Sequence, residues 1–261
     1  MLTMKDVTVR YAATGGGAAD VLALNRVDIE VRSGEFIVII GPSGCGKTSL
    51  LEVIGGFRNV SSGTVTMDGQ PLNGPHPDIG VVFQEDSTFP WLNTEQNIEF
   101  SVKHRGMPAA QRPKRVAEMI KLIGLEGFEK HRPAQLSGGM RQRVALGRAL
   151  ASSPKLLLMD EPFGALDEQS RLTLGDELLR IWRATGCTIV FITHSLSEAA
   201  MLADRVVVLS ARPGRVVDVI SNRLGPSRSS GSLGRPEFTE MTARLWNLLR
   251  EQTAVAGAAA C

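Results

Sequence analysis

Short apolar runs recur along the chain, with stretches between them that can form helices. The runs lie at residues 35–40, 63–67, 78–83, 155–159, 188–192 and 205–209. Each has the length of a strand, and from residue 138 onward a helical pattern separates each run from the next. This alternation predicts an α/β fold whose sheet is mostly parallel and whose crossovers are right-handed.

The middle and the end of the chain have different patterns. From residue 89 to about residue 135 the pattern is helical, with one apolar face, so a helical lobe is expected there. That face consists of Val116, Met119, Ile120 and Ile123. Residues 222–236 are rich in Ser, Gly, Arg and Pro and predict a linker. An amphipathic helix is expected over 237–252, followed by an alanine-rich tail that frays.

Composition and charge narrow the class of protein. The chain is 43% hydrophobic and 21% charged, which is typical of a compact globular protein. Its 29 basic residues nearly balance its 27 acidic residues, so nucleic acid is not expected as a partner. The apolar runs are far shorter than the roughly 20 residues that a membrane-spanning helix needs.

The first residues and the cysteines indicate the compartment. The opening MLTMKDVTVRY alternates polar and apolar residues, which predicts a strand rather than a signal peptide. Cys45, Cys187 and Cys261 form neither a paired framework nor a C-x-x-C pattern. The chain is therefore expected in the cytosol with reduced thiols.

A glycine-rich motif, GPSGCGKT, directly follows the strand predicted at 35–40 and precedes a helix. It matches G-x-x-x-x-G-K-[ST], in which the backbone N–H groups cradle phosphates, Lys47 reaches the β- and γ-phosphates and the Thr48 hydroxyl binds Mg²⁺. A chance glycine-rich turn is the alternative, and the strand and helix around the motif argue against it. The predicted nucleotide-binding residues are Gly41, Pro42, Ser43, Gly44, Cys45, Gly46, Lys47, Thr48 and Ser49. For Cys45 we favour a space-filling role within this loop.

Two adjacent carboxylates, Asp160 and Glu161, end the apolar run LLLM. Adjacent strand residues point to opposite faces. Asp160 is therefore predicted to coordinate Mg²⁺, directly or through water, and Glu161 to turn toward the γ-phosphate as the base or the orienter of the attacking water. Taken alone, the pair is equally compatible with a solvated acidic turn.

The motif LSGGMRQR, from Leu136 to Arg143, resembles the signature of the ATP-binding-cassette (ABC) ATPases. The resemblance implies a P-loop NTPase core with an N-terminal antiparallel β subdomain and an inserted α-helical subdomain at about 89–150. The ATPase domain would cover 1–221, with a linker at 222–236 and a helix and tail at 237–261. It also implies a head-to-tail dimer in which Ser137, Gly138 and Gly139 of one copy close over the γ-phosphate held by Lys47 of the other.

Four further residues match motifs of that family. Gln84 would sense Mg²⁺ and the attacking water, and His194 would contact the γ-phosphate. Asp167, in GALD, would cross the dimer interface, although the family more often begins this motif with Ser than with the Gly164 found here. Tyr11 would stack on adenine. Outside this set, Gln84 would be a surface polar residue, and a lone histidine after a strand is more often structural.

FPWLNTEQNIEF, at 89–100, and ARPGRV, at 211–216, resemble the nitrate, sulfonate and taurine importer branch of the family. Phe89, Pro90 and Trp91 would then line the groove that receives a short helix of the membrane subunit. The alternative is that Phe89 and Trp91 belong to the core of the helical lobe.

These resemblances imply a subunit that hydrolyses ATP with Mg²⁺ and powers an importer for a small anionic or zwitterionic solute. Its partners would be a second copy or a homologous ATPase subunit, transmembrane permease subunits and, indirectly, a substrate-binding protein. It would lie at the cytoplasmic face of the membrane. An ABC ATPase of another importer or of an exporter remains an alternative. Non-transport cassettes and metabolic kinases fit the motifs less well.

Overall fold

The computed structural model describes residues 1–12, 20–84 and 88–258. Most of the stretch TGGGAAD at 14–20, whose composition predicts a turn-rich loop, lies outside these residues, and so does Cys261. The chain divides into two compact units. The first consists of residues 1–76 and 190–261, and the second of residues 77–189. The boundary falls within a strand, β8, which spans Thr188–Ile192.

The first unit opens with an antiparallel sheet in the order β2-β1-β4-β5. These strands are β1 (Leu2–Tyr11), β2 (Val21–Val31), β4 (Ser62–Met67) and β5 (Gln70–Pro71). Apolar residues of β1 and β2, including Leu2, Val9 and Leu24, are buried in the core. The strand predicted for the first residues is therefore present and ends at Tyr11.

A second set of strands in the first unit carries the glycine-rich motif. In the order β10-β9-β3-β8 it contains β3 (Phe36–Ile40), β9 (Arg205–Leu209) and β10 (Val216–Ser221). β3 pairs with β9 in parallel, and β10 pairs with β9 antiparallel. Every residue of β3 is buried, which explains its unbroken apolar sequence.

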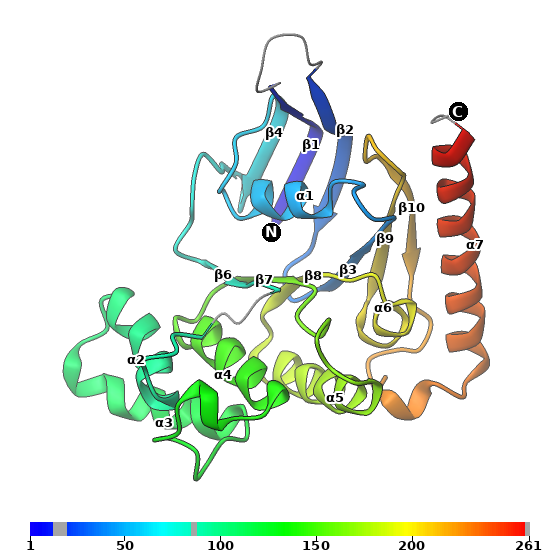
Figure 1. Cartoon of the computed structure of the whole chain (residues 1–261). Coiled ribbons are helices and arrows are strands. Elements are labelled where there is room, and N and C mark those ends of the chain that lie inside the picture. The colour runs from blue at the N-terminus through cyan, green and yellow to red at the C-terminus, as the bar shows by residue number, and fades with distance from the viewer. Residues whose placement is uncertain (13–19, 85–87, 259–261) are drawn as a thin grey trace. The chain divides into compact units, whose positions relative to one another are not determined.

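Three helices belong to the first unit, namely α1 (Lys47–Ile54), α6 (Leu196–Leu202) and α7 (Pro236–Ala258). α7 runs beside β10, and Arg244 of α7 forms an ion pair with Asp218 of β10 at 2.7 Å (Figure 1). α6 packs against both α7 and β3.

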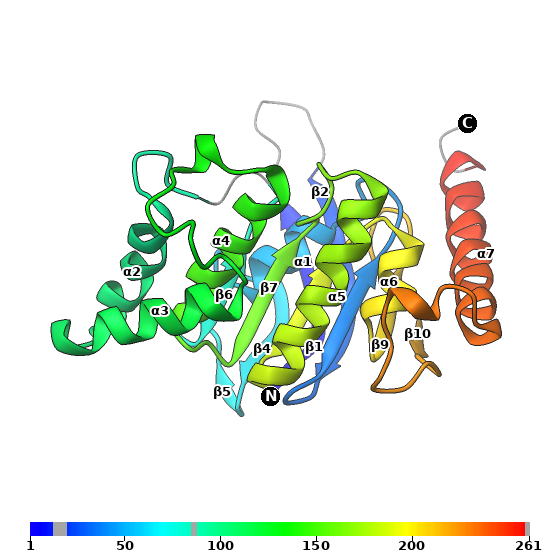
Figure 2. The ribbon, with the colours of Figure 1, turned by 90° about the horizontal axis from the view of Figure 1, so that it is seen from below.

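The second unit contains the helical lobe. Its strands β6 (Ile79–Val82) and β7 (Leu156–Asp160) pair in parallel. Its helices are α2 (Thr94–His104), α3 (Arg112–Leu122), α4 (Gly138–Ala151) and α5 (Glu168–Thr185). α2, α3 and α4 pack on one another (Figure 2), and the four apolar positions predicted for one face of α3 and its end are all buried.

The α/β class, the antiparallel N-terminal sheet, the mostly parallel sheet and the inserted helices are confirmed. Three details differ from the pattern-based expectation. β10 was not predicted, α7 is longer than the expected 237–252, and the segment 222–236 has three buried residues, Leu224, Arg228 and Ser232. Among the described residues, no helix combines the length and the apolarity needed to cross a membrane.

Candidate functional site

The glycine-rich loop joins β3 to α1 in the first unit. Gly46, the residue before α1, has φ 104°, a conformation that side-chain-bearing residues rarely adopt. Lys47 is buried, and its Nζ donates hydrogen bonds to the backbone oxygens of Gly41 (2.8 Å) and Pro42 (3.1 Å). The loop therefore curls around the Lys47 ammonium group at the start of a helix, where backbone N–H groups and the helix dipole favour an anion.

Crowding explains why two of the glycines in this loop carry no side chain. A Cβ atom at Gly46 would lie 2.8 Å from the backbone oxygen of Ala23, and one at Gly41 would lie 2.6 Å from Cys45 Sγ. Burial raises the pKa of the Cys45 thiol, and the charge of Lys47 opposes this effect without cancelling it. A buried thiol with a raised pKa fits the space-filling role that the sequence favoured.

Tyr11 lies next to α1. Its hydroxyl is 2.8 Å from Ser49 Oγ and donates a longer hydrogen bond of 3.4 Å to Glu52. The guanidinium of Arg58 stacks over the Tyr11 ring, with Cζ 4.2 Å from the ring centroid. The sequence predicted that the ring of Tyr11 stacks on adenine. In the structure, the guanidinium of Arg58 covers one face of that ring.

His194 follows β8 and is exposed. β8 neighbours β3, and the Thr193 N–H donates to the oxygen of Ile39 at 3.3 Å. The histidine is thus held beyond the end of a strand next to the one that leads into the glycine-rich loop. The first unit therefore brings His194 and the residues from Gly41 onward to neighbouring strand ends.

The acidic pair and Gln84 belong to the second unit. β6 and β7 run in parallel, so Gln84, two residues past β6, and Asp160, the last residue of β7, follow neighbouring strand ends. Asp160 and Glu161 are half-buried, and Gln84 is exposed. Glu161 has φ 42°, so its direction is set by a left-handed backbone rather than by the strand alternation that the sequence argument used.

The three residues predicted to hold a metal, Thr48, Gln84 and Asp160, all offer oxygen atoms as ligands. Within residues 1–12, 20–84 and 88–258, no three His, Cys, Asp or Glu side chains gather as a protein-only metal site would require. Mg²⁺ does not need such a cage, because it is bound through one or two carboxylates together with substrate phosphates and water. The hydroxyl of Thr48, the amide of Gln84 and the carboxylate of Asp160 are chemically suited to it.

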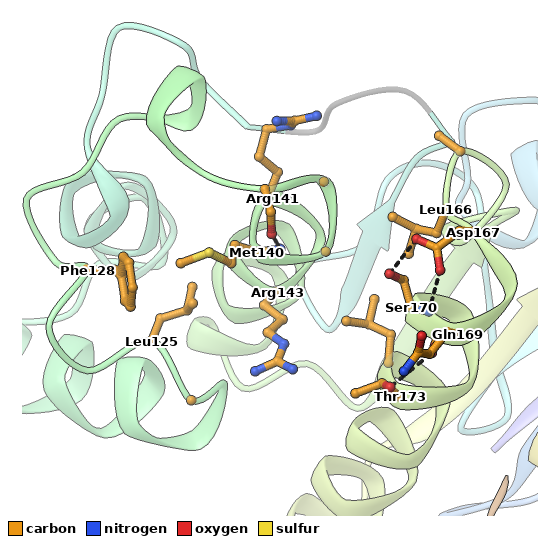
Figure 3. Close-up of a pocket in the computed structure, with 16 residues that line it drawn as sticks. Leu125, Phe128, Met140, Arg141, Arg143, Leu166, Asp167, Gln169, Ser170 and Thr173 are labelled. Carbon is orange, nitrogen blue, oxygen red and sulfur yellow. Dashed lines mark hydrogen bonds between the residues drawn. The ribbon is translucent and has the colours of Figure 1, made fainter.

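The LSGGM segment begins α4. Ser137 caps this helix, and its Oγ accepts the N–H of Met140 at 3.3 Å. A cavity of about 810 Å³ lies beside it. Figure 3 shows Leu125, Phe128 and Met140 on one wall of this cavity and residues of the GALD loop and α5 on the other. Ser137, Gly138, Gly139 and Asp167 all line this cavity. The LSGGM segment and the GALD loop, both predicted to face a second copy, therefore line the same cavity in the second unit.

Asp167 caps α5. Its carboxylate accepts hydrogen bonds from the N–H of Ser170 at 2.9 Å and from the hydroxyl of Ser170 at 2.6 Å. These bonds lower the pKa of Asp167 below its ordinary value. The group is thus held as an anion at a helix start.

Comparison with known proteins decides the family. The protein-family model described as "ABC transporter" matches residues 24–164, which is more than half of the chain. The taurine import ATP-binding protein TauB of Burkholderia pseudomallei is 44% identical over 97% of this chain and 98% of its own length. TauB of Yersinia pestis is 46% identical over 83% of this chain and 87% of its own length.

A solved structure, of the ATP-binding cassette MJ0796 in a dimeric post-hydrolysis state bound to ADP and Pi, matches with a TM-score of 0.73. It is 33% identical to this chain, and the match covers 85% of this chain and 99% of the solved one. The chain belongs to the ABC transporter family. It is an ABC ATPase, and it binds ATP.

Some residues around the sites of this ABC ATPase carried little sequence signal. Arg58 lies over Tyr11, and Ser170 and Thr173 line the cavity beside the LSGGM segment. Ser170 and Thr173 belong to α5 and Arg58 to the chain after α1, so nothing in a linear motif marks them. Arg143, which also lines the cavity, was the exception because it ends the LSGGMRQR motif.

Proposed function

We propose that this ABC ATPase is the ATP-hydrolysing subunit of an importer for a small anionic or zwitterionic solute. Two relatives with 44% and 46% identity are named taurine import ATP-binding proteins, and the match to one of them covers nearly the whole of both chains. The residues of the FPWLNTEQNIEF and ARPGRV segments support the same branch. The solute itself would contact the permease and its binding protein rather than this subunit.

The observation that carries the dimer proposal is the cavity shared by the LSGGM segment and the GALD loop. Ser137, Gly138 and Gly139 stand at the start of α4, where N–H groups and the helix dipole favour a phosphate. The lid they would form closes over the triphosphate of a second copy, or of a homologous ATPase subunit. The solved cassette that this chain resembles is a dimer, which supports pairing with a second copy.

In the proposed reaction the glycine-rich loop and Lys47 hold the β- and γ-phosphates. Thr48, Gln84 and Asp160 would hold Mg²⁺, which supplies charge neutralisation on the phosphate oxygens. Glu161 takes the proton of the attacking water, and His194 keeps the γ-phosphate and water in line. ATP binding closes the two cassettes, and release of phosphate lets them open, which gives the two-state element that a transporter needs.

An aromatic cluster at the start of the helical lobe is the proposed contact to a permease. Phe89 packs in this cluster between Trp91, at 5.4 Å, and Phe100, at 4.7 Å between ring centroids. Arg148 lies over the Phe89 ring at 4.6 Å. Trp91 is 66% exposed, which is uncommon for a residue of this size in a packed lobe. Phe89 thus packs within the helical lobe. Trp91 offers an exposed apolar surface to a short helix of the membrane subunit, at the cytoplasmic face of the membrane.

Substitution of the proposed base tests the enzymatic role. Glu161→Gln keeps the shape of the side chain but cannot take a proton, so ATP binding should persist while turnover falls by about 10²- to 10⁴-fold. Because ATP then stays in place, size-exclusion chromatography with ATP and Mg²⁺ should detect a dimer. Glu126→Gln, at an exposed glutamate of the same unit, is the matched control and should behave as wild type. Wild-type turnover in Glu161→Gln would remove Glu161 from the mechanism.

The transport role is tested by the partner that copurifies. A tagged wild-type chain should bring down a permease from its own membranes, and Trp91→Ala should lose most of it while the isolated subunit keeps its ATPase activity. Trp246→Ala is the control, since Trp246 is 58% exposed but lies on α7. An exporter would show no accompanying substrate-binding protein. Equal recovery of the permease by Trp91→Ala and the wild type would place the docking surface elsewhere.

A further inference from the structure

The segment at 222–236, whose composition predicts a linker, is anchored in the first unit by buried side chains. Arg228 is only 2% exposed, although arginine is rarely buried, and Leu224 and Ser232 are buried as well. The segment therefore has a fixed place in the fold between β10 and α7, and its anchoring contacts need an explanation.

Those contacts converge on the end of the short helix α6. The Arg228 guanidinium donates two hydrogen bonds to the oxygen of Leu202, at 2.7 and 3.1 Å, and pairs with Asp204 at 2.8 Å. The amide of Asn222 donates to the oxygens of Ala200 (2.7 Å) and Ala203 (2.8 Å). Two side chains of the segment thus satisfy three carbonyl groups at a helix end, where a cation is also favoured by the helix dipole.

At its other end, α6 begins at Leu196, two residues after His194. Ser195 caps the helix by accepting the N–H of Glu198 at 3.3 Å, and the Thr193 hydroxyl bonds to the Glu198 carboxylate. α6 has only seven residues, so its own hydrogen bonds are too few to hold it, and its caps and packing decide its position. A change at the Arg228 end is therefore transmitted over two turns of helix to the backbone that carries His194.

We propose that Arg228 and Asn222 are positioning residues for His194. By capping the last turn of α6 they stabilise this helix and fix its orientation. The imidazole of His194 is thereby held where it can contact the γ-phosphate and the attacking water. The segment at 222–236 then contributes to ATP hydrolysis. This inference rests on the role proposed for His194 above, and it adds the residues that fix that histidine.

A double-mutant cycle in the full chain tests the coupling. Arg228→Ala should lower kcat by about tenfold and Asn222→Ala by about threefold, while the KM for ATP stays within about twofold, because misplacing a group of the transition state costs rate rather than ground-state binding. In a His194→Ala background, already slow, neither substitution should lower kcat further, because a positioning residue has nothing left to position. Arg228→Lys, which keeps the charge beside Asp204, should recover part of the rate.

Arg244→Ala is the control for the attachment of α7. It breaks the ion pair between α7 and Asp218 of β10 but keeps the Arg228 and Asn222 side chains that bond to α6, and it should leave kcat unchanged. A purely structural role for Arg228 predicts a lower melting temperature and equal fold losses of kcat with and without His194, and that result would overturn the proposal. If Arg228→Ala does not fold, Asn222→Ala decides. A slow His194→Ala beside fast Arg228→Ala and Asn222→Ala sinks this inference alone. A fast His194→Ala sinks both the proposed role of the histidine and this inference.

Discussion

The two helix starts predicted to hold phosphate, at α1 and at α4, are built in opposite ways. α1 follows Gly46 in a left-handed conformation, and no side chain of the described residues caps it. α4 follows Ser137 in an extended conformation, and the Ser137 hydroxyl caps it. A Cβ at Gly46 would meet backbone, whereas a Cβ at Gly139 would only touch the end of the Leu174 side chain at 3.7 Å.

This difference separates glycines that the fold needs from glycines that it does not. Close contacts with the backbone of neighbouring strands fix the loop before α1. Its phosphate-binding shape is therefore set by the packing of the first unit. The start of α4 is an ordinary capped helix with spare room at Gly139. If Gly139 is required for activity, the requirement must come from something that approaches α4 from outside.

The largest effect is expected at Gly46. Gly46→Ala places a methyl group 2.8 Å from the oxygen of Ala23 and demands φ near 104°, so the loop must shift. We expect ATP affinity to fall by about 100-fold or more, because the N–H groups would no longer converge on one phosphate. Equilibrium binding of a fluorescent ATP analogue measures this loss.

The control for backbone strain alone is Gly186→Ala, at the end of α5. Gly186 has φ 62°, and nothing lies within 4 Å of the position of its Cβ. Its substitution should cost about 1–2 kcal/mol of stability and leave ATP binding intact. Equal ATP affinities in Gly46→Ala and the wild type would show that the loop before α1 is not a preformed cradle.

A smaller effect is expected at Ser137. Ser137→Ala removes the cap of α4, which costs about 1 kcal/mol of stability, and removes a hydroxyl from the proposed lid, which should lower turnover about tenfold. Asn93→Ala is the matched control, since Asn93 caps α2 and accepts the N–H of Gln96 at 2.8 Å. Both variants should lose similar stability in urea unfolding, and only Ser137→Ala should lose ATPase activity. If the two variants hydrolyse ATP equally fast, Ser137 is a cap and nothing more.

The sequence predicted well what local pattern controls. β8 and β9 were placed at the observed residues, and the glycine-rich loop was recognised between β3 and α1, because apolar runs and glycine spacing are local signals. His194 and the residues from Gly41 onward come to the ends of the neighbouring strands β8 and β3. Short motifs suffice when the chemistry depends on one turn of backbone.

What the sequence missed depends on partners far along the chain. Arg228 bonds to residues more than twenty positions away in the sequence. The composition of 222–236, rich in Ser, Gly and Arg, predicts a linker and gives no sign that Arg228 is buried. Arg58 covers the ring of Tyr11 although the two residues lie far apart in the sequence, and no motif links them. Glu161 leaves the strand alternation because its backbone is left-handed, and a strand pattern contains no sign of that turn.

The smallest effect on stability is expected at Gly139, and it bears most directly on the comparison. Gly139→Ala puts a better helix former into the first turn of α4 with room for its methyl group, so stability should rise by about 0.5 kcal/mol or stay unchanged. Gly147→Ala, in the same helix, is the control. Its Cβ would lie 2.8 Å from Ile123 Cδ1, so overpacking should cost about 1–3 kcal/mol.

The two variants should then show opposite profiles. Gly147→Ala should be less stable and hydrolyse ATP normally at low temperature. Gly139→Ala should be as stable as the wild type but turn over about threefold more slowly, because a methyl group at the helix start holds back the phosphate of a second copy. A Gly139→Ala variant with both wild-type stability and wild-type turnover would mean that nothing approaches this helix start closely, and the comparison between α1 and α4 would lose its functional meaning.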